Sequence, residues 1–179
     1  VYDGSEIHEA VLTLLALDRA GARIVCMAPD IDQYHVINHL TQEVSNEKRN
    51  VLVESARIAR GEIKDIREVK AEDIDGLIIP GGYGAAKNLS DFAFKGAEAT
   101  VNPDVGRLLS EMVAAGKPVG AICIAPATLT RALSDRKPEV TIGTDEGTAA
   151  VIEAMGGRHK ACSVDMIHVD ARNRIVSTP

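Results

Sequence analysis

The sequence predicts an α/β fold, built as an open and mostly parallel sheet with helices on both faces. Short apolar runs that suit single strands alternate with stretches of helical periodicity over most of the 179 residues. Aromatic residues make up only 3% of the chain, so the core must consist of Val, Ile, Leu and Ala, which suits buried parallel strands. In such sheets ligands bind outside the carboxyl ends of the strands, and we expect the functional residues there.

Composition and charge restrict the possible functions. With 45% hydrophobic and 26% charged residues, the chain has the balance of a single globular domain over residues 1–179. A net charge of −6 and the scarcity of aromatic residues disfavour binding to nucleic acid. No apolar run approaches the length of a membrane span and no signal peptide is visible, so we expect a cytoplasmic protein without a membrane partner. The three cysteines, odd in number and far apart, predict no disulfide framework and no metal site.

The first helix is expected to begin after Asp3 and to end at Gly21. Asp3 and Glu6 have the spacing of a capping box, with Asp3 as the cap. Glu6 and Glu9 lie three residues apart near the first turn, so both carboxylates can face one side of the helix. They either serve a site at this end of the helix or only stabilise its N-terminus.

A strand over residues 23–28 follows, and then a long polar excursion over residues 30–50. Cys26 lies inside the strand and is expected to be an ordinary core thiol. His35 and His39 are four residues apart in the excursion, but this pair alone does not predict a metal site. We expect the polar segment to be a surface loop that covers a site.

A helix over residues 51–60 leads to a buried strand over residues 77–80, which runs into the glycine pair Gly81-Gly82. A glycine pair after a strand lets a backbone N–H approach a ligand closely, and a plain tight turn is the alternative. The segment completes neither a phosphate-binding loop nor a dinucleotide-binding fingerprint, so no nucleotide cofactor is predicted.

The stretch around Cys123 carries the strongest signal for chemistry. Asn102 and Pro103 begin a helix as its cap and its first residue, and a strand buried on both faces follows over residues 119–122. Pro126 suits the first turn of another helix, so Cys123 falls on a sharp strand-to-helix turn of the kind that forms a nucleophile elbow. The N–H groups and the positive end of the second helix would favour the thiolate. A buried structural cysteine is the alternative.

The C-terminal third continues the alternation. We expect helices over residues 127–133 and 148–155, a strand over residues 140–143, and a hairpin of strands over residues 167–169 and 174–176. Both ends of the chain look abrupt, so we expect the domain to be trimmed at both termini.

Three features at strand ends together form a coherent site. The thiolate of Cys123 could attack a carbonyl group, while the N–H groups of Ile124 and Gly82 stabilise the resulting oxyanion. A glutamate of the first helix could hydrogen-bond the sulfur and move a proton during turnover.

The residues at these positions resemble a known family. The stretches that carry the resemblance are Tyr2–Glu9, Ile79–Ser90 and Cys123–Pro126, with Arg49–Leu52 and Ala56–Gly61 in support. Together they are similar to the ThiJ/PfpI superfamily and, within it, to the ElbB type, the isoprenoid-biosynthesis proteins with an amidotransferase-like domain. The resemblance covers essentially the whole chain. It implies a flavodoxin-like fold, as in class I glutamine amidotransferases, and a homodimer.

The same resemblance implies a glyoxalase, a lyase that needs no glutathione, metal or other cofactor. Its small dicarbonyl substrate would be glyoxal, converted to glycolate, with methylglyoxal, converted to lactate, as a further substrate. Cys123 would form a hemithioacetal, and Glu9, or Glu6 one turn earlier, would move a proton between the two carbons. The residues that would bind the oxyanion and the substrate are Gly81, Gly82 and Ile124.

The sequence departs from the family pattern at the histidines. Many members have His directly after the nucleophile, where this chain has Ile124. Others supply one from the strand around residues 140–143, where this chain has Gly143-Thr144-Asp145. Peptidase activity is therefore not expected, and a glutamate alone must act as the base.

Two alternative functions remain. One is a glutamine amidotransferase-like hydrolase that uses His168 and Asp170. The other is a redox-sensing or partner-binding protein in which Cys123 is oxidised to a sulfinic acid.

Overall fold

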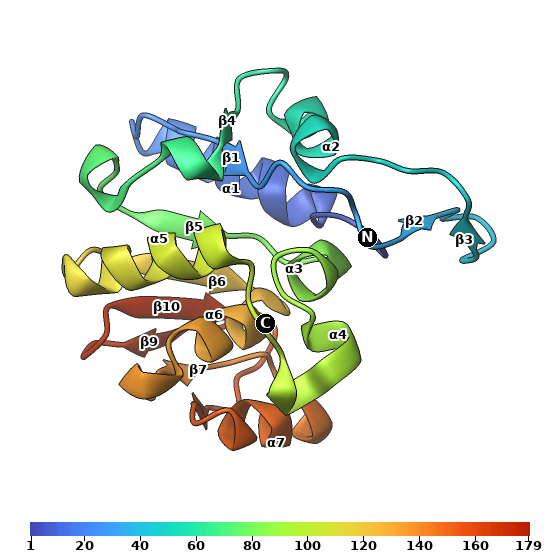
Figure 1. Cartoon of the computed structure of the whole chain (residues 1–179). Coiled ribbons are helices and arrows are strands. Elements are labelled where there is room, and N and C mark those ends of the chain that lie inside the picture. The colour runs from blue at the N-terminus through green and yellow to red at the C-terminus, as the bar shows by residue number, and fades with distance from the viewer.

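The computed structural model describes residues 1–179 as helices packed around short, mostly parallel strands (Figure 1). The helices are α1 (Ile7–Arg19), α2 (Val51–Ile58), α3 (Tyr83–Lys87), α4 (Phe92–Lys95), α5 (Pro103–Ala114), α6 (Ala125–Ala132) and α7 (Glu146–Ala154). The strands are β1 (Met27–Ala28), β2 (Val36–Ile37), β3 (Val44–Ser45), β4 (Lys64–Asp65), β5 (Leu77–Ile79), β6 (Val119–Ile122), β7 (Glu139–Val140), β8 (Arg158–His159), β9 (His168–Asp170) and β10 (Ile175–Thr178). No helix of this set is both long and apolar enough to cross a membrane.

The central sheet has four strands in the order β5-β6-β10-β9. β6 pairs in parallel with both β5 and β10, and β9 pairs antiparallel with β10, which is the predicted C-terminal hairpin. Two further parallel pairs, β1-β4 and β7-β8, lie on either side of this sheet, and the antiparallel hairpin β2-β3 projects from the body (Figure 1). The predicted α/β class with a mostly parallel sheet is confirmed.

The core lies where α5 and α6 pack against the central sheet. α5 begins as predicted, because the side chain of Asn102 accepts hydrogen bonds from the N–H groups of Asp104 and Val105 while Pro103 occupies the first turn. Its buried stripe consists of Val105, Leu108, Leu109 and Met112. α6 carries Pro126 in its first turn, also as predicted. The two helices therefore fix the end of β6, where Cys123 follows.

Some strands differ in length or in burial from their prediction. One reason is that a strand forms only where a second strand lies beside it. β1 covers Met27–Ala28 instead of residues 23–28, since only this part pairs with β4. The polar residues 30–50 are not a plain loop, because they contain the hairpin β2-β3. β6 is not buried on both faces: Val119 and Ala121 face the core, whereas the residue that follows each of them lies on a less buried face.

Candidate active site

Cys123 lies on a sharp turn between β6 and α6. Its φ angle is 60°, a left-handed value that is uncommon for a residue other than glycine. Its N–H donates to the carbonyl oxygen of Thr178 on β10 at 2.9 Å, which ties the turn to the neighbouring strand. Backbone strain of this kind persists only where the surrounding structure holds it. This is the backbone geometry that a nucleophile elbow requires.

Glu9 reaches Cys123 from the first turn of α1. Its carboxyl group lies beside the side chain of Cys123, and its Oε2 accepts from the N–H of Gly81 at 2.6 Å. Gly81 permits this approach, because a Cβ at that position would lie 2.6 Å from the Cβ of Cys123 and 2.7 Å from Oε2 of Glu9. Three residues far apart in the sequence thus meet at the start of α1, the end of β5 and the end of β6.

Glu6 does not lie beside the sulfur as Glu9 does. The predicted capping box, with Asp3 as the cap, is wrong. Glu6 is itself the cap of α1, since its Oε2 accepts from the N–H of Glu9 at 3.0 Å and its Oε1 lies 3.2 Å from Nδ1 of His8. The hydrogen bond from Glu9 and the neighbouring His8 lower the pKa of Glu6, although partial burial opposes them. Asp3 does not cap the helix but accepts from the N–H of Ile37 on β2 at 2.7 Å. Of the two candidate glutamates, only Glu9 lies beside the sulfur.

Gly82 and Ile124 direct their backbone N–H groups at the sulfur of Cys123. Gly82 caps α3 with a φ angle of 89°, and a Cβ at this position would overlap the backbone of Gly4 and Glu6. Ile124 occupies the corresponding place at the start of α6. Two amides that converge on one atom form a site for negative charge, either on the sulfur or on an oxygen bonded next to it.

In the folded protein, other effects on the pKa of Cys123 outweigh the effect of the helix end. Burial raises the pKa of the Cys123 thiol, and the charge of Glu9 raises it further. The N–H groups of Gly82 and Ile124 lower this pKa, but by less than the combined rise. The end of α6 therefore favours the thiolate of Cys123 less than burial and Glu9 disfavour it.

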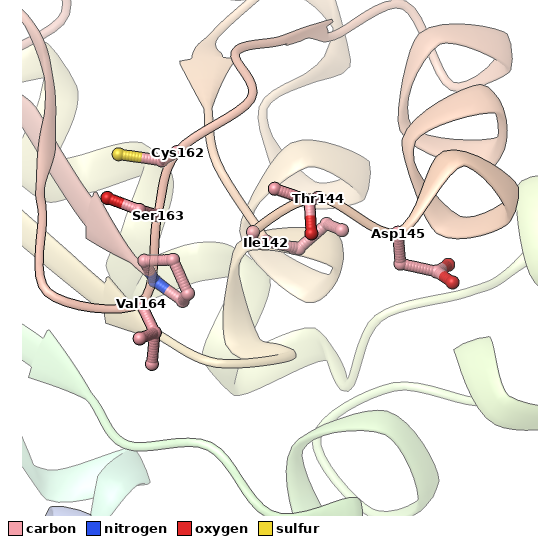
Figure 2. Close-up of a pocket in the computed structure, with 8 residues that line it drawn as sticks. Ile142, Thr144, Asp145, Cys162, Ser163 and Val164 are labelled. Atoms are coloured by element: carbon pink, nitrogen blue, oxygen red, sulfur yellow. The ribbon is translucent and has the colours of Figure 1, made fainter.

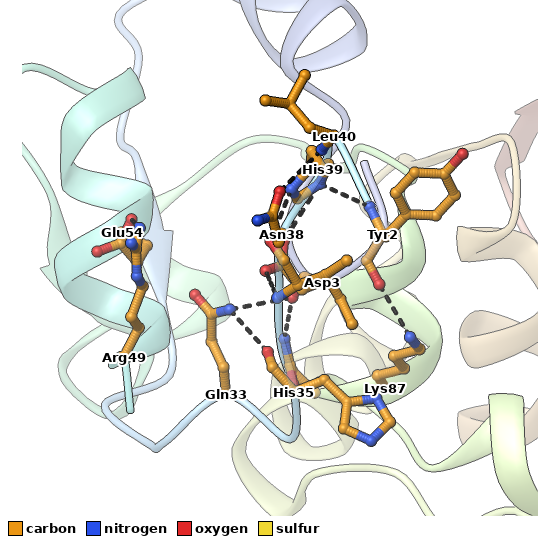
Figure 3. Close-up of polar contacts among 12 residues, drawn as sticks. Tyr2, Asp3, Gln33, His35, Asn38, His39, Leu40, Arg49, Glu54 and Lys87 are labelled. Atoms are coloured by element: carbon orange, nitrogen blue, oxygen red, sulfur yellow. Dashed lines mark hydrogen bonds and ion pairs between the residues drawn. The ribbon is translucent and has the colours of Figure 1, made fainter. Parts of the chain in front are cut away.

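A polar cluster that the sequence patterns did not indicate holds the loop before α1 (Figure 3). Nε2 of His39 accepts from the N–H of Tyr2 at 3.1 Å, and Nζ of Lys87 donates to the carbonyl oxygen of Tyr2 at 2.9 Å. Nε2 of Gln33 donates to the carbonyl oxygen of Asp3 at 3.4 Å. The partners in these pairs are 30 to 85 positions apart in the sequence, so no local sequence pattern indicates the contacts. The cluster fixes the loop that leads into Glu6 and Glu9.

His168 and Asp170 do not approach Cys123. Both lie on β9, and β10 separates β9 from β6, so two strand spacings of about 5 Å each lie between them and the elbow. Nε2 of His168 lies 3.6 Å from Oε2 of Glu139. Asp170 accepts instead from the N–H of Glu139 at 2.9 Å and from Nδ2 of Asn173 at 2.7 Å. The two residues form no triad with the cysteine, so the amidotransferase-like alternative lacks its histidine and its acid.

A separate cavity of about 530 Å³ lies between the loop after β7 and the segment before β9 (Figure 2). Cys162 and Pro179 are among its lining residues, whereas Cys123 and Glu9 are not. The cavity therefore does not contain the pair of groups that the candidate chemistry needs.

Comparisons with known proteins identify the family. Residues 1–144 match the model of the DJ-1/PfpI family. The chain is 48% identical to the human glutamine amidotransferase-like class 1 domain-containing protein 3, mitochondrial, and 46% identical to the rat ES1 protein homolog, mitochondrial; each match covers 100% of this chain and 70% of the relative. Among solved structures, the isoprenoid biosynthesis protein with amidotransferase-like domain from Ehrlichia chaffeensis has a TM-score of 0.91 and 44% identity, over 99% of this chain and 81% of that chain. The chain therefore belongs to the DJ-1/PfpI family, and the resemblance predicted from its motifs is confirmed.

Proposed function

We propose that the protein is a cofactor-independent glyoxalase that converts glyoxal to glycolate, and methylglyoxal to lactate. The observation that carries the proposal is that Cys123, on a left-handed turn, and Oε2 of Glu9 both lie against Gly81. The backbone N–H groups of Gly82 and Ile124 face the same sulfur and lower its pKa. A nucleophile, a proton-transfer group and a site for negative charge are what the internal redox isomerisation of a dicarbonyl requires. Membership of the family supports an activity of this kind.

The first step adds the sulfur of Cys123 to one aldehyde carbon of glyoxal. The amides of Gly82 and Ile124 stabilise the alkoxide that forms as the C–S bond is made. Glu9 takes the proton of the Cys123 thiol as the sulfur attacks and gives it to this oxygen, which completes a hemithioacetal. Glu9 is then a carboxylate, ready to act as the base of the next step.

The second step moves a proton between the two carbons. The carboxylate of Glu9 removes the proton from the carbon that bears the sulfur, which leaves an enediolate. Glu9 then returns the proton to the other carbon, while the hydroxyl proton of the first carbon passes to the oxygen of the second. The first carbon becomes a thioester and the second becomes an alcohol, so the oxidation and the reduction occur within one molecule. Water hydrolyses the thioester, which releases glycolate and regenerates the thiol of Cys123.

Replacement of Cys123 by Ser tests the proposal. Glycolate formation from glyoxal should be lost in Cys123→Ser, because a serine hydroxyl without a strong base is a poor nucleophile at neutral pH. Cys162→Ser is the matched control, since Cys162 is also free and partly exposed but lies in the separate cavity. It should retain the wild-type rate. Full activity of Cys123→Ser would show that the mechanism is wrong.

Redox sensing is a second candidate function, because the same two amides could bind the oxygens of a Cys123 sulfinate. Mild peroxide should then oxidise Cys123 more readily than Cys26 or Cys162, all three of which are free. Mass spectrometry of the three cysteine peptides measures this selectivity. Oxidation that spares Cys123 would remove this candidate.

A further inference from the structure

A buried pair of hydroxyl groups joins the two helices that carry the candidate oxyanion amides. Thr128 in α6 is fully buried, and Ser90, which follows α3, is 4% exposed. Oγ1 of Thr128 lies 2.8 Å from the carbonyl oxygen of Ala85 in α3 and 2.8 Å from Oγ of Ser90. Oγ of Ser90 lies 3.1 Å from the same carbonyl oxygen.

The direction of these hydrogen bonds follows from the number of protons. Each hydroxyl group has a single proton to donate, so at most two of the three contacts can be hydrogen bonds at one time. The two shorter contacts form a continuous chain in which Ser90 donates to Thr128 and Thr128 donates to the carbonyl oxygen of Ala85.

The carbonyl oxygen of Ala85 needs a donor from outside its own helix. α3 has only 5 residues, so its carbonyl groups lack the following turn that would normally satisfy them. The N–H groups of Asn88 and Leu89 both donate to the carbonyl oxygen of Gly84, at 2.8 and 3.1 Å. Because Ala85 is buried, an unpaired carbonyl there would be costly, and Thr128 supplies the missing donor.

This bond acts on the candidate site through α3. The N–H of Ala85 donates to the carbonyl oxygen of Gly82 at 3.0 Å, and the N–H of Gly82 faces the sulfur of Cys123. Thr128 itself belongs to the helix that begins just after Cys123. We propose that Thr128, assisted by Ser90, is a positioning residue that holds the amide of Gly82 against Cys123. The proposal deepens the proposed function, and its turnover readout rests on that function.

The test measures the reactivity of Cys123 in Thr128→Val, an isosteric change that removes the hydroxyl group. Iodoacetamide is the probe, and mass spectrometry of the Cys123 peptide gives the alkylation rate at each pH. With the Gly82 amide displaced, the midpoint of this pH profile should move upward. The kcat for glyoxal should fall by about 10-fold at unchanged KM, the scale of a small misplacement of a catalytic group. Thr128→Ser, which keeps the hydroxyl group, should have the wild-type pH midpoint and the wild-type kcat.

Thr130→Val is the matched control. Thr130 is equally buried in the same helix, but its Oγ1 has no hydrogen-bond partner. This variant should keep the wild-type pH midpoint and the wild-type kcat. A Thr128→Val protein that melts earlier but keeps the wild-type pH midpoint would overturn the proposal, because Thr128 would then be merely structural. An equal shift in Thr130→Val would overturn it as well.

Ser90→Ala provides a second variant in case Thr128→Val does not fold. It removes the donor to Thr128 but leaves the bond from Thr128 to Ala85, so a smaller shift in the same direction is expected. An unshifted profile in a folded Ser90→Ala protein would contradict the proposal. If the wild-type protein does not convert glyoxal, the proposed function fails, yet the alkylation profiles still decide the role of Thr128.

Discussion

Gly81 is the residue that lets Glu9 approach Cys123. A methyl group at this position would overlap both Cβ of Cys123 and Oε2 of Glu9. Gly81→Ala should therefore lower glyoxal turnover by about 10-fold or more, because the two reacting groups are forced apart. Gly76→Ala is the control, since its Cβ would meet only Pro118, at an ordinary 3.5 Å. Wild-type turnover in Gly81→Ala would contradict the packing argument.

Glu9 and Glu6 offer a second test at the scale of single residues. Glu9→Gln keeps the size of the side chain but cannot cycle a proton, so kcat for glyoxal should fall by about 100-fold or more. Glu6→Gln keeps an oxygen that can cap α1 and lies away from the sulfur, so its kcat should match the wild type. Steady-state kinetics of the two variants measure the difference. Equal losses in both would show that Glu9 has no special role.

At this scale the sequence indicated the turn at Cys123 and the glycine pair, because each depends on adjacent residues. It did not indicate that Glu6 caps α1, since the spacing from Asp3 to Glu6 is the same as that from Glu6 to Glu9. The direction of the pKa shift of Cys123 was also missed. That shift depends on burial and on Glu9, which is distant in sequence and close only after folding.

At the scale of elements, the cap of α5 supports the helix that packs behind β6. Asn102 accepts from two N–H groups that would otherwise lack partners. Asn102→Ala should lower the free energy of unfolding by about 1 kcal/mol, and Asn102→Gly by only a few tenths of that. Urea denaturation measures both values. A variant Asn102→Ala as stable as the wild type would show that the cap contributes nothing.

Helices were easier to predict than strands, for a physical reason. α5 and α6 carry their start signals and their periodicity in their own residues, so their existence and their first turns could be predicted. The extent of β1 depends on how far β4 accompanies it, and the hairpin β2-β3 contains no strong apolar alternation. The polar cluster that holds Tyr2 and Asp3 arises from contacts between distant segments, so no element pattern announces it.

At the scale of the whole molecule, Asp91 makes stability depend on pH. Burial alone would raise the pKa of Asp91, but hydrogen bonds from Lys95 and Thr100 outweigh burial and lower it to about 2. In the unfolded chain an aspartate titrates near pH 4, so the stabilisation is complete above about pH 4 and is lost as the pH falls toward 2. The melting temperature should fall less steeply over this range in Asp91→Asn than in the wild type. Asp135→Asn, which changes an exposed carboxylate, should follow the wild type, and parallel curves for all three proteins would contradict the assignment.

The most direct test of the Cys123–Glu9 pair is the fate of the transferred proton. If Glu9 carries the proton between the two carbons through an enediol, its carboxyl proton exchanges with solvent before it is returned. Glycolate made from glyoxal in D₂O should therefore carry deuterium on carbon 2, as measured by NMR, and neither Cys123→Ser nor Glu9→Gln should form this product at the wild-type rate. Glycolate without deuterium would contradict a transfer in which the carboxyl proton of Glu9 exchanges with solvent before it reaches the second carbon.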